Sequence, residues 1–327
     1  MHDIDQTPRS LNPVRTGNEA DQAQLDGILA SPRRTVRRPR QSRWAWTVTA
    51  AAVTAGVIGY VVVDPFGVAV QPALAATPAP LHPRHADRQA ADVLEETAGR
   101  IAGQADPRPK SWKSEHFIRE DWALSTRFDD VQVTSAVIPE RRETWERHDG
   151  SSHWKSKSMT PQFQDGRQRD IWEKAGSVGK EPVRSAGTSG PDAVGAGEPP
   201  TTVEGMRTWL ADGQKTGPGL LYEVLPERFQ DHVFSPAQRA AVLRVLASTD
   251  GIVYAGTVGD RAGRTGEAFS LTDRFGGLPN KRTLVFDPAT GNLLAYEEQI
   301  LDDTGRLNVR PHSVIEYSTF IRAERLP

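Results

Sequence analysis

The residues best placed for chemistry in this chain are two histidines on either side of a tight Asp-Gly turn. His148 and His153 flank Asp149, so two imidazoles and one carboxylate could in principle share a metal ion. The alternative is a polar hairpin tip that serves solubility, and two histidines with one carboxylate are a thin ligand set for zinc. His82 and His85, in a proline-rich stretch, form a weaker pair. We therefore predict no metal site.

Other patterns that suggest catalysis are incomplete. Glycines at positions 256, 259, 263 and 266 are spaced like a phosphate-binding loop, but the Walker lysine is missing, and a hairpin turn explains them better. There is no G-x-S-x-G nucleophile elbow. The acidic pairs Asp129-Asp130 and Asp302-Asp303 lie in turn-like segments, where carboxylates are usually solvated. The chain has no cysteine, which excludes thiolate nucleophiles and disulfides. We predict that the protein is not an enzyme and has no catalytic, cofactor-binding or metal-binding residues.

Tryptophans concentrate toward the N-terminal side of the segment from residue 86 to the C-terminus, which is predicted below to be the outer domain. One interpretation places them in the core, between sheet and helices. The other places some of them around a cavity on a concave sheet face, where they would offer apolar surface to a ligand. Nearby basic residues could then meet an acidic headgroup or a peptide, or could simply form the solvent face of the strands. The tryptophans are Trp112, Trp122, Trp145, Trp154, Trp172 and Trp209, and the basic residues are Lys113, Arg141, Arg142, Lys155 and Lys157.

Residues 44–63, WAWTVTAAAVTAGVIGYVVV, form the one long apolar run and carry no charge. A bilayer core requires about 20 apolar residues of helix, which this run supplies. The preceding cluster of basic side chains orients such a span, because positive residues are retained in the cytoplasm. We therefore predict a single-pass protein of the cell membrane with a cytoplasmic N-terminus and an extracytoplasmic C-terminal domain. The cluster consists of Arg33, Arg34, Arg37, Arg38, Arg40 and Arg43.

A cleaved secretory signal is the alternative, since Ala73-Leu74-Ala75 resembles a cleavage site. That site lies well past the apolar run, and the run is longer than the usual 7–15 residues of a signal. We prefer a permanent transmembrane helix.

Composition divides the 327 residues into zones. Residues 1–43 are polar and are predicted to be a disordered cytoplasmic arm. Residues 64–85, rich in proline and alanine, are predicted to be a semi-rigid spacer. Residues 86–327 are predicted to form one extracytoplasmic domain, with a low-complexity loop at 176–200. The net charge of −2 argues against nucleic acid as a partner, whereas the arginine cluster could contact anionic membrane lipid.

Helix signals in the domain differ in strength. Residues 86–103 are predicted to be a helix that ends at Gly103 and buries Ala91, Leu94, Ala98, Ile101 and Ala102. A capping box at 201–204, with Thr201 as the cap, is expected to open a second helix that buries Trp209 and Leu210. Ser235-Pro236-Ala237-Gln238 is the clearest start, with Val242, Leu243 and Leu246 facing inward and an end at Asp250-Gly251.

Strand signals fill the rest of the domain. Strands are predicted at 112–119, 131–138, 141–148 and 152–159, with a hairpin at Asp149-Gly150. Further strands are predicted at 252–258, 267–272, 282–286, 292–301 and 314–321, with a turn at 287–291 between two of them. Strands in succession, joined by tight turns with helices between groups, indicate an α+β fold with an antiparallel sheet and helices on one face.

The order of these features resembles a known family. A basic arm, one span, an Ala/Pro spacer, and the segments SPAQRAAVLRVLASTDGIVYAGTVGDRAGRTGEAF and RTLVFDPATGNLLAYEEQIL are similar to a family of uncharacterised actinobacterial single-pass membrane proteins. Its members are often encoded beside extracytoplasmic-function sigma factors. The resemblance is best over residues 235–301. It implies no catalytic residues, and an outer domain similar to the curved half-barrel of lipoprotein carriers and of periplasmic sigma-factor regulators.

Three functions remain open. The first is a regulatory or sensory protein whose outer domain binds a ligand or partner and whose arm contacts a cytoplasmic regulator such as a sigma factor. The apolar patch Leu25, Ile28 and Leu29 would make that contact, and the alternative is that the arm only orients the span. The second is a membrane-tethered carrier of an apolar or lipid-like ligand. The third, an enzyme, has the least support.

Overall fold

The computed structural model describes residues 76–124, 136–163, 165–174, 176–177, 180–190, 197–211, 217–305, 307 and 309–327. The chain divides into two compact units, Met1–Thr54 and Ala55–Pro327, and all described residues belong to the second. The predicted arm, span and first part of the spacer lie outside the described residues. Within the described ranges, no helix is both long and apolar enough to cross a membrane.

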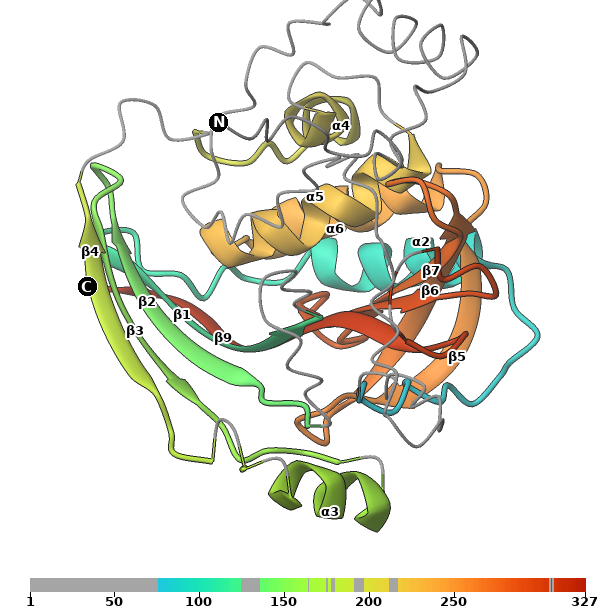
Figure 1. Cartoon of the computed structure of the whole chain (residues 1–327). Coiled ribbons are helices and arrows are strands. Elements are labelled where there is room, and N and C mark those ends of the chain that lie inside the picture. Colours follow the sequence, from blue (N-terminus) through green and yellow to red (C-terminus); the bar gives the residue numbers. More distant parts are fainter. Residues whose placement is uncertain are drawn as a thin grey trace, which may run out of the picture. The chain divides into compact units, whose positions relative to one another are not determined.

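The described strands form one open antiparallel sheet, as predicted (Figure 1). The strand order is β4-β3-β2-β1-β9-β8-β7-β6-β5, so β4 and β5 are the edges. Every neighbouring pair is antiparallel. The bounds are β1 Ser114–Ala123, β2 Glu140–Arg147, β3 Ser152–Ser158, β4 Arg184–Ser189, β5 Val253–Gly259, β6 Thr265–Asp273, β7 Asn280–Phe286, β8 Leu293–Ile300 and β9 Val314–Leu326.

Helices α2, α5 and α6 lie along one face of this sheet, which bends around them in Figure 1. The helix bounds are α2 Ala90–Ala102, α3 Gly166–Lys174, α4 Val203–Ala211, α5 Pro218–Asp231 and α6 Pro236–Ala247. Helix α5 packs against β6, β7, β8 and β9, while α2 packs against α6 and β5. Leu225 and Phe229 of α5 belong to the same buried cluster as Phe269, Leu284 and Phe286 of the sheet. Burial of these apolar side chains is the main force that holds α5 on the sheet.

The start of α6 is as predicted. Ser235 is the N-cap and its side chain accepts a hydrogen bond from the backbone N–H of Gln238, whose own side chain returns to the N-cap backbone. Val242, Leu243 and Leu246 are buried. The end of the helix differs, because α6 stops at Ala247 rather than at Asp250-Gly251. The hydroxyls of Ser248 and Thr249 donate to carbonyls of the last turn and end the helix earlier.

Helices α4 and α2 differ from the predictions in where they begin. In α4 the cap is Thr202, whose hydroxyl accepts from the N–H of Gly205, and not Thr201. Trp209 and Leu210 do face the core, as expected.

Helix α2 begins at Ala90 rather than at residue 86. The backbone is extended at the bridge between Arg84 and Thr257 of β5 and again at the N-cap Gln89, with φ −73° and ψ 137°, so the helix starts only after Gln89. Gly103 is the C-cap, as predicted. The buried side is formed by Ala90, Val93, Leu94, Thr97, Ala98 and Ile101, while Ala91 and Ala102 are exposed.

The hairpins at Asp149-Gly150 and at 287–291 are confirmed by the β2–β3 and β7–β8 pairings. The expected loop at 176–200 contains strand β4, which forms because β3 offers it an unpaired edge. Of the expected strand 131–138, residues 131–135 lie outside the described ranges, and Val137 makes only an isolated bridge to Gln162. Helices α3 and α5 were not predicted. Pro226 inside α5 is a helix breaker whose cost is overcome by packing on the sheet.

The end of the predicted spacer is also part of the domain. The backbone N–H of Leu81 donates to the Glu297 carboxylate at 3.0 Å, and the N–H of Arg84 donates to the Thr257 carbonyl at 2.7 Å. Gly256 makes the second contact possible, because a Cβ there would lie 1.9 Å from the Arg84 carbonyl oxygen. The ordered domain therefore begins before residue 86.

Candidate functional site

Strands β1 to β4 form a part of the sheet that we call the wing, which extends beyond α5 and α6 in Figure 1. The turn between β2 and β3 is the one predicted at Asp149-Gly150. Gly150 has a positive φ of 74°, and the Asp149 carboxylate accepts a hydrogen bond from the N–H of Ser151 at 2.8 Å. One face of the wing is turned toward the helices, since Arg119 of β1 contacts Gln230 of α5. We call this the inner face and the opposite one the outer face.

The outer face carries a row of stacked rings across neighbouring strands. The register places His116 of β1 beside Trp145 of β2, and Trp145 beside His153 of β3. The ring centroids are 4.9 Å apart for the first pair and 4.5 Å for the second, both stacked. The nitrogens of His116 lie 2.9 Å from Glu143 and 3.1 Å from Glu324. These contacts hold the row rigidly on the sheet.

The two candidate metal-binding histidines take part in different contacts. His153 stacks on Trp145, whereas His148 stacks on Trp112 with centroids 3.7 Å apart. The described residues contain no group of three His, Asp or Glu side chains arranged to hold a metal ion. Both rings therefore serve the aromatic surface of the wing.

The inner face near the free edge carries a second aromatic group. Trp154 of β3 lies over Gly187 of β4, where an added Cβ would come within 2.9 Å of the indole. The guanidinium of Arg142 lies 4.4 Å from the Trp154 ring centroid on the same face, a cation–π contact. A shallow depression of about 510 Å³ opens at this edge, lined by Trp145, His153, Trp154, Lys155, Ala186, Gly187 and Thr188.

The tryptophans divide between the two interpretations. Trp172 is buried, with 7 % of its surface exposed. Trp209 is partly buried and packs against the core. Trp145 and Trp154 line the depression, but Trp145 lies on the outer face and not on the concave face expected for a ligand cavity. Strand alternation explains this, because Trp154 pairs with Thr144, and the next residue on β2, Trp145, points to the opposite face.

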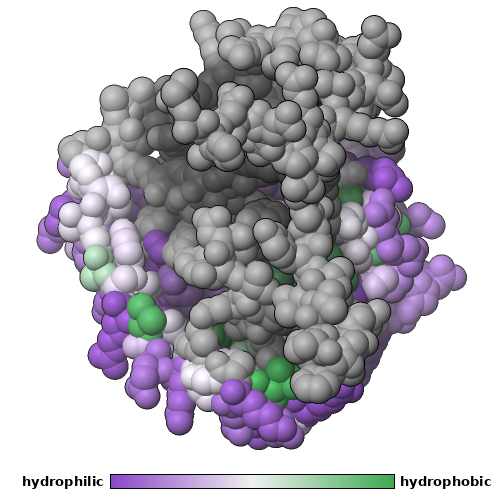
Figure 2. Space-filling model, in the orientation of Figure 1, coloured by the Kyte–Doolittle hydropathy of each residue, from purple (hydrophilic) through white to green (hydrophobic). Residues whose placement is uncertain are grey.

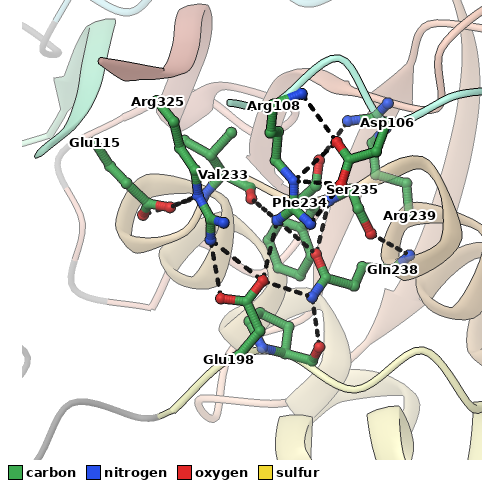
Figure 3. A network of polar contacts seen from close by, with 11 residues as sticks. Asp106, Arg108, Glu115, Glu198, Val233, Phe234, Ser235, Gln238, Arg239 and Arg325 are labelled. Carbon is green, nitrogen blue, oxygen red and sulfur yellow. Dashed lines mark hydrogen bonds and ion pairs between the residues drawn. The ribbon is translucent and has the colours of Figure 1, made fainter. Parts of the chain in front are cut away.

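A polar network joins the wing to the helices (Figure 3). Arg325 of β9 donates to Glu115 of β1 at 2.7 Å and to Glu198 at 2.9 Å. Arg108 donates to Glu198 at 3.1 Å and to Gln238 of the α6 capping box, also at 3.1 Å. Burial raises the pKa of Glu115 above its usual value, against the opposing charge of Arg325. These charged side chains are paired with one another within the protein. The network therefore positions the wing.

Hydrophilic residues dominate the described surface in Figure 2, with hydrophobic residues in small patches. On the outer face of β3 and β4, the basic residues are Lys155, Lys157 and Arg184, and neither strand contains an acidic residue. Lys155 is neutralised by Glu143 at 2.9 Å. Of the predicted basic residues, Arg141, Lys155 and Lys157 lie on this outer face, Arg142 is buried, and Lys113 precedes β1.

His116 and Gly187 were not identified from the sequence. Their positions depend on the register between β1 and β2 and on the existence of β4, and no local pattern encodes either. A sequence signal does exist for the alternation SHWKSKS of β3, which places His153, Lys155 and Lys157 on one face.

No protein-family model matches the chain, and no curated protein matches it. Among solved structures, the chain is similar to MucB in complex with MucA(peri), with 15% identity and a TM-score of 0.25 over 73% of this chain and 57% of that chain. It is also similar to MucB alone, with 16% identity and a TM-score of 0.26 over 73% and 60%. The chain thus spans less than two thirds of the length of these MucB chains. At these TM-scores, the function has to be argued from the wing itself.

Proposed function

We propose that this chain is a single-pass membrane protein whose extracytoplasmic domain binds a partner through the wing. The observation that supports this best is the wing's edge, where stacked aromatic rings and basic side chains lie beside β4, a strand with no second neighbour among the described residues. Exposed aromatic and arginine side chains are enriched at protein interfaces. We also propose that the protein is not an enzyme.

The proposed membrane arrangement rests on the apolar run 44–63 and the arginines before it. The segment from Leu81 to Arg84 is bound to the sheet, so the tether between span and domain is shorter than the 64–85 spacer. Movement of the domain would then act on the span through residues 64–80. The arm 1–43 would pass this on to a cytoplasmic regulator such as a sigma factor, through Leu25, Ile28 and Leu29.

The alternative, a tethered carrier of an apolar ligand in a half-barrel, needs an apolar cavity between helices and sheet. Phe229 of α5 lies 6.3 Å from Phe286 of β7, measured between ring centroids, and Leu225 packs in the same cluster. Side chains of the protein fill this space, which favours the regulatory function.

The test is the simultaneous change of Leu25, Ile28 and Leu29 to Ser in the full chain. We expect unchanged membrane insertion and lost recovery of an extracytoplasmic-function sigma factor of the same cell in a pull-down. A matched control changes Ile4, Leu11 and Val14 of the same arm to Ser. If the first variant recovers the sigma factor as well as the unchanged chain does, or if no chain recovers it, the regulatory proposal is wrong.

A further inference from the structure

The two edges of the sheet differ in how they are protected. At β5, the chain covers its own edge, because the N–H of Arg84 donates to the Thr257 carbonyl at 2.7 Å. At β4, the part of the chain that the structure describes supplies no strand on the outer side. Exposed edges are usually protected by prolines or charges, but β4 has the sequence RSAGTS with one charge and no proline.

The direction of the free backbone groups follows from the β3–β4 register. The N–H of Ser158 donates to the Val183 carbonyl at 2.9 Å, so these two residues are a hydrogen-bonded pair. In an antiparallel ladder such pairs alternate with pairs that are not hydrogen-bonded. The N–H and C=O groups of Arg184, Ala186 and Thr188 therefore point away from β3. They form a row of donors and acceptors that another strand can use.

The outer face of this edge has an unbalanced positive charge. The register aligns Glu120, Arg141, Lys157 and Arg184 in one row across β1 to β4. Glu120 pairs with Arg141 at 3.1 Å, at the end of the row that is farther from β4. Lys157 and Arg184 lie directly opposite each other, and like charges in such positions are destabilising. A carboxylate on a strand next to β4 would relieve this repulsion.

The inner face of the same edge carries one large apolar side chain, Trp154, among serines. The Trp154 ring lies over Gly187, which has no side chain to cover it, and the indole lines the depression at this edge. Side chains of an added strand would alternate between the two faces. Those on one face would meet Arg184, and those on the other would meet Trp154.

We propose that β4 binds an extended segment of a protein partner, in which acidic and apolar residues alternate. The segment pairs with the backbone of Arg184, Ala186 and Thr188, places its carboxylates beside Arg184 and Lys157, and places its apolar side chains against Trp154. Strand addition of this kind takes affinity from the main chain and specificity from alternate side chains. The inference rests on the proposed function, since it names the chemistry of the partner.

The probe is a fluorescein-labelled peptide of alternating glutamate and valine, with a peptide of alternating lysine and valine as its control. Binding to the purified full chain is measured by fluorescence anisotropy. We expect the glutamate peptide to bind, with affinity that falls as salt rises, and the lysine peptide not to bind. Ala186→Pro removes an outward N–H and leaves the β3–β4 ladder intact, so it should weaken binding about fivefold or more.

Ala186→Thr is the matched control, because it adds bulk but keeps the N–H, and it should bind the glutamate peptide like the unchanged chain. Arg184→Glu, which offsets the charge of Lys157, should remove the preference for the glutamate peptide. Equal binding by Ala186→Pro and Ala186→Thr, equal binding of both peptides, or no binding would overturn the proposal. So would dimers of the chain that Ala186→Pro abolishes, since the edge would then bind a second copy. None of these results alters the sigma-factor pull-down, which tests the proposed function separately.

Discussion

Loss of Arg325 should destabilise the domain by removing the charge that compensates a buried carboxylate. The Arg325 and Glu115 side chains are 10 % and 7 % exposed and lie 2.7 Å apart. Removing one partner of a buried ion pair costs about 3–5 kcal/mol, because the other charge stays buried without compensation. The second partner, Glu198, is 56 % exposed and adds little. We therefore expect Arg325→Met to lower the free energy of unfolding by about 3–5 kcal/mol.

The assay is urea unfolding of the purified full chain, followed by tryptophan fluorescence. Arg322→Met is the matched control on the same strand, because Arg322 is 55 % exposed and pairs with Glu324 at 3.3 Å. Its loss should cost less than about 1 kcal/mol. Burial already raises the pKa of Glu115, and without Arg325 that pKa rises further. A carboxyl with a raised pKa in the folded state stabilises below its unfolded pKa and loses this contribution as pH rises. The deficit of Arg325→Met should therefore be smaller near about pH 4 than at pH 8.

A deficit for Arg325→Met no larger than that for Arg322→Met would refute this account of the network. Adding Glu115→Gln to Arg325→Met should recover part of the loss, since no buried charge then remains. A double variant less stable than Arg325→Met would show that the carboxylate is stabilised by something other than Arg325.

Three further results are expected. Gly256→Val should release Arg84 from β5, because a Cβ would overlap the Arg84 carbonyl. Hydrogen exchange at residues 81–85 should become faster. The control Gly259→Val should leave that exchange unchanged, because a Cβ there meets nothing. Ser235→Ala should lower the free energy of unfolding by about 1 kcal/mol, and an unchanged urea midpoint would contradict the capping box. The pKa of Glu316 is raised to about 8, first by burial and then by repulsion from Glu298, Glu223, Asp121 and Glu227. Stability should therefore fall as pH rises from about 4.5 to 8. Glu316→Gln should flatten that urea-midpoint profile, and an unchanged slope would contradict the assignment.

Local signals in the sequence were enough to predict much of the second half of the domain. The Ser235 capping box and the 287–291 turn act through neighbouring residues, so they could be recognised without knowledge of the fold. Strand β4 could not, because Arg184–Ser189 is made of small residues that resemble a loop and becomes a strand only by pairing with β3. The stacking of His116 on Trp145 requires the register of strands that are distant in sequence.

The predicted tryptophan surface illustrates the same limit. The sequence indicated that aromatic and basic residues belong to the strands at 141–148 and 152–159. It did not indicate which face the helices would cover, because that depends on how α5 packs on β6 to β9. Trp145 consequently lies on the outer face of the wing, opposite to the side where a ligand cavity was expected.

The most direct test of a tethered outer domain that binds a partner through the wing is labelling of single cysteines in intact cells. The chain has no cysteine of its own, so Thr188→Cys on β4 and Thr272→Cys on β6 can be compared without background. Both positions are exposed. We predict that a membrane-impermeant maleimide labels both positions without permeabilisation. In cells, position 188 should be labelled more slowly than position 272, whereas in the purified chain the two rates should be equal. Labelling that requires permeabilisation, or equal rates in cells, would contradict the account.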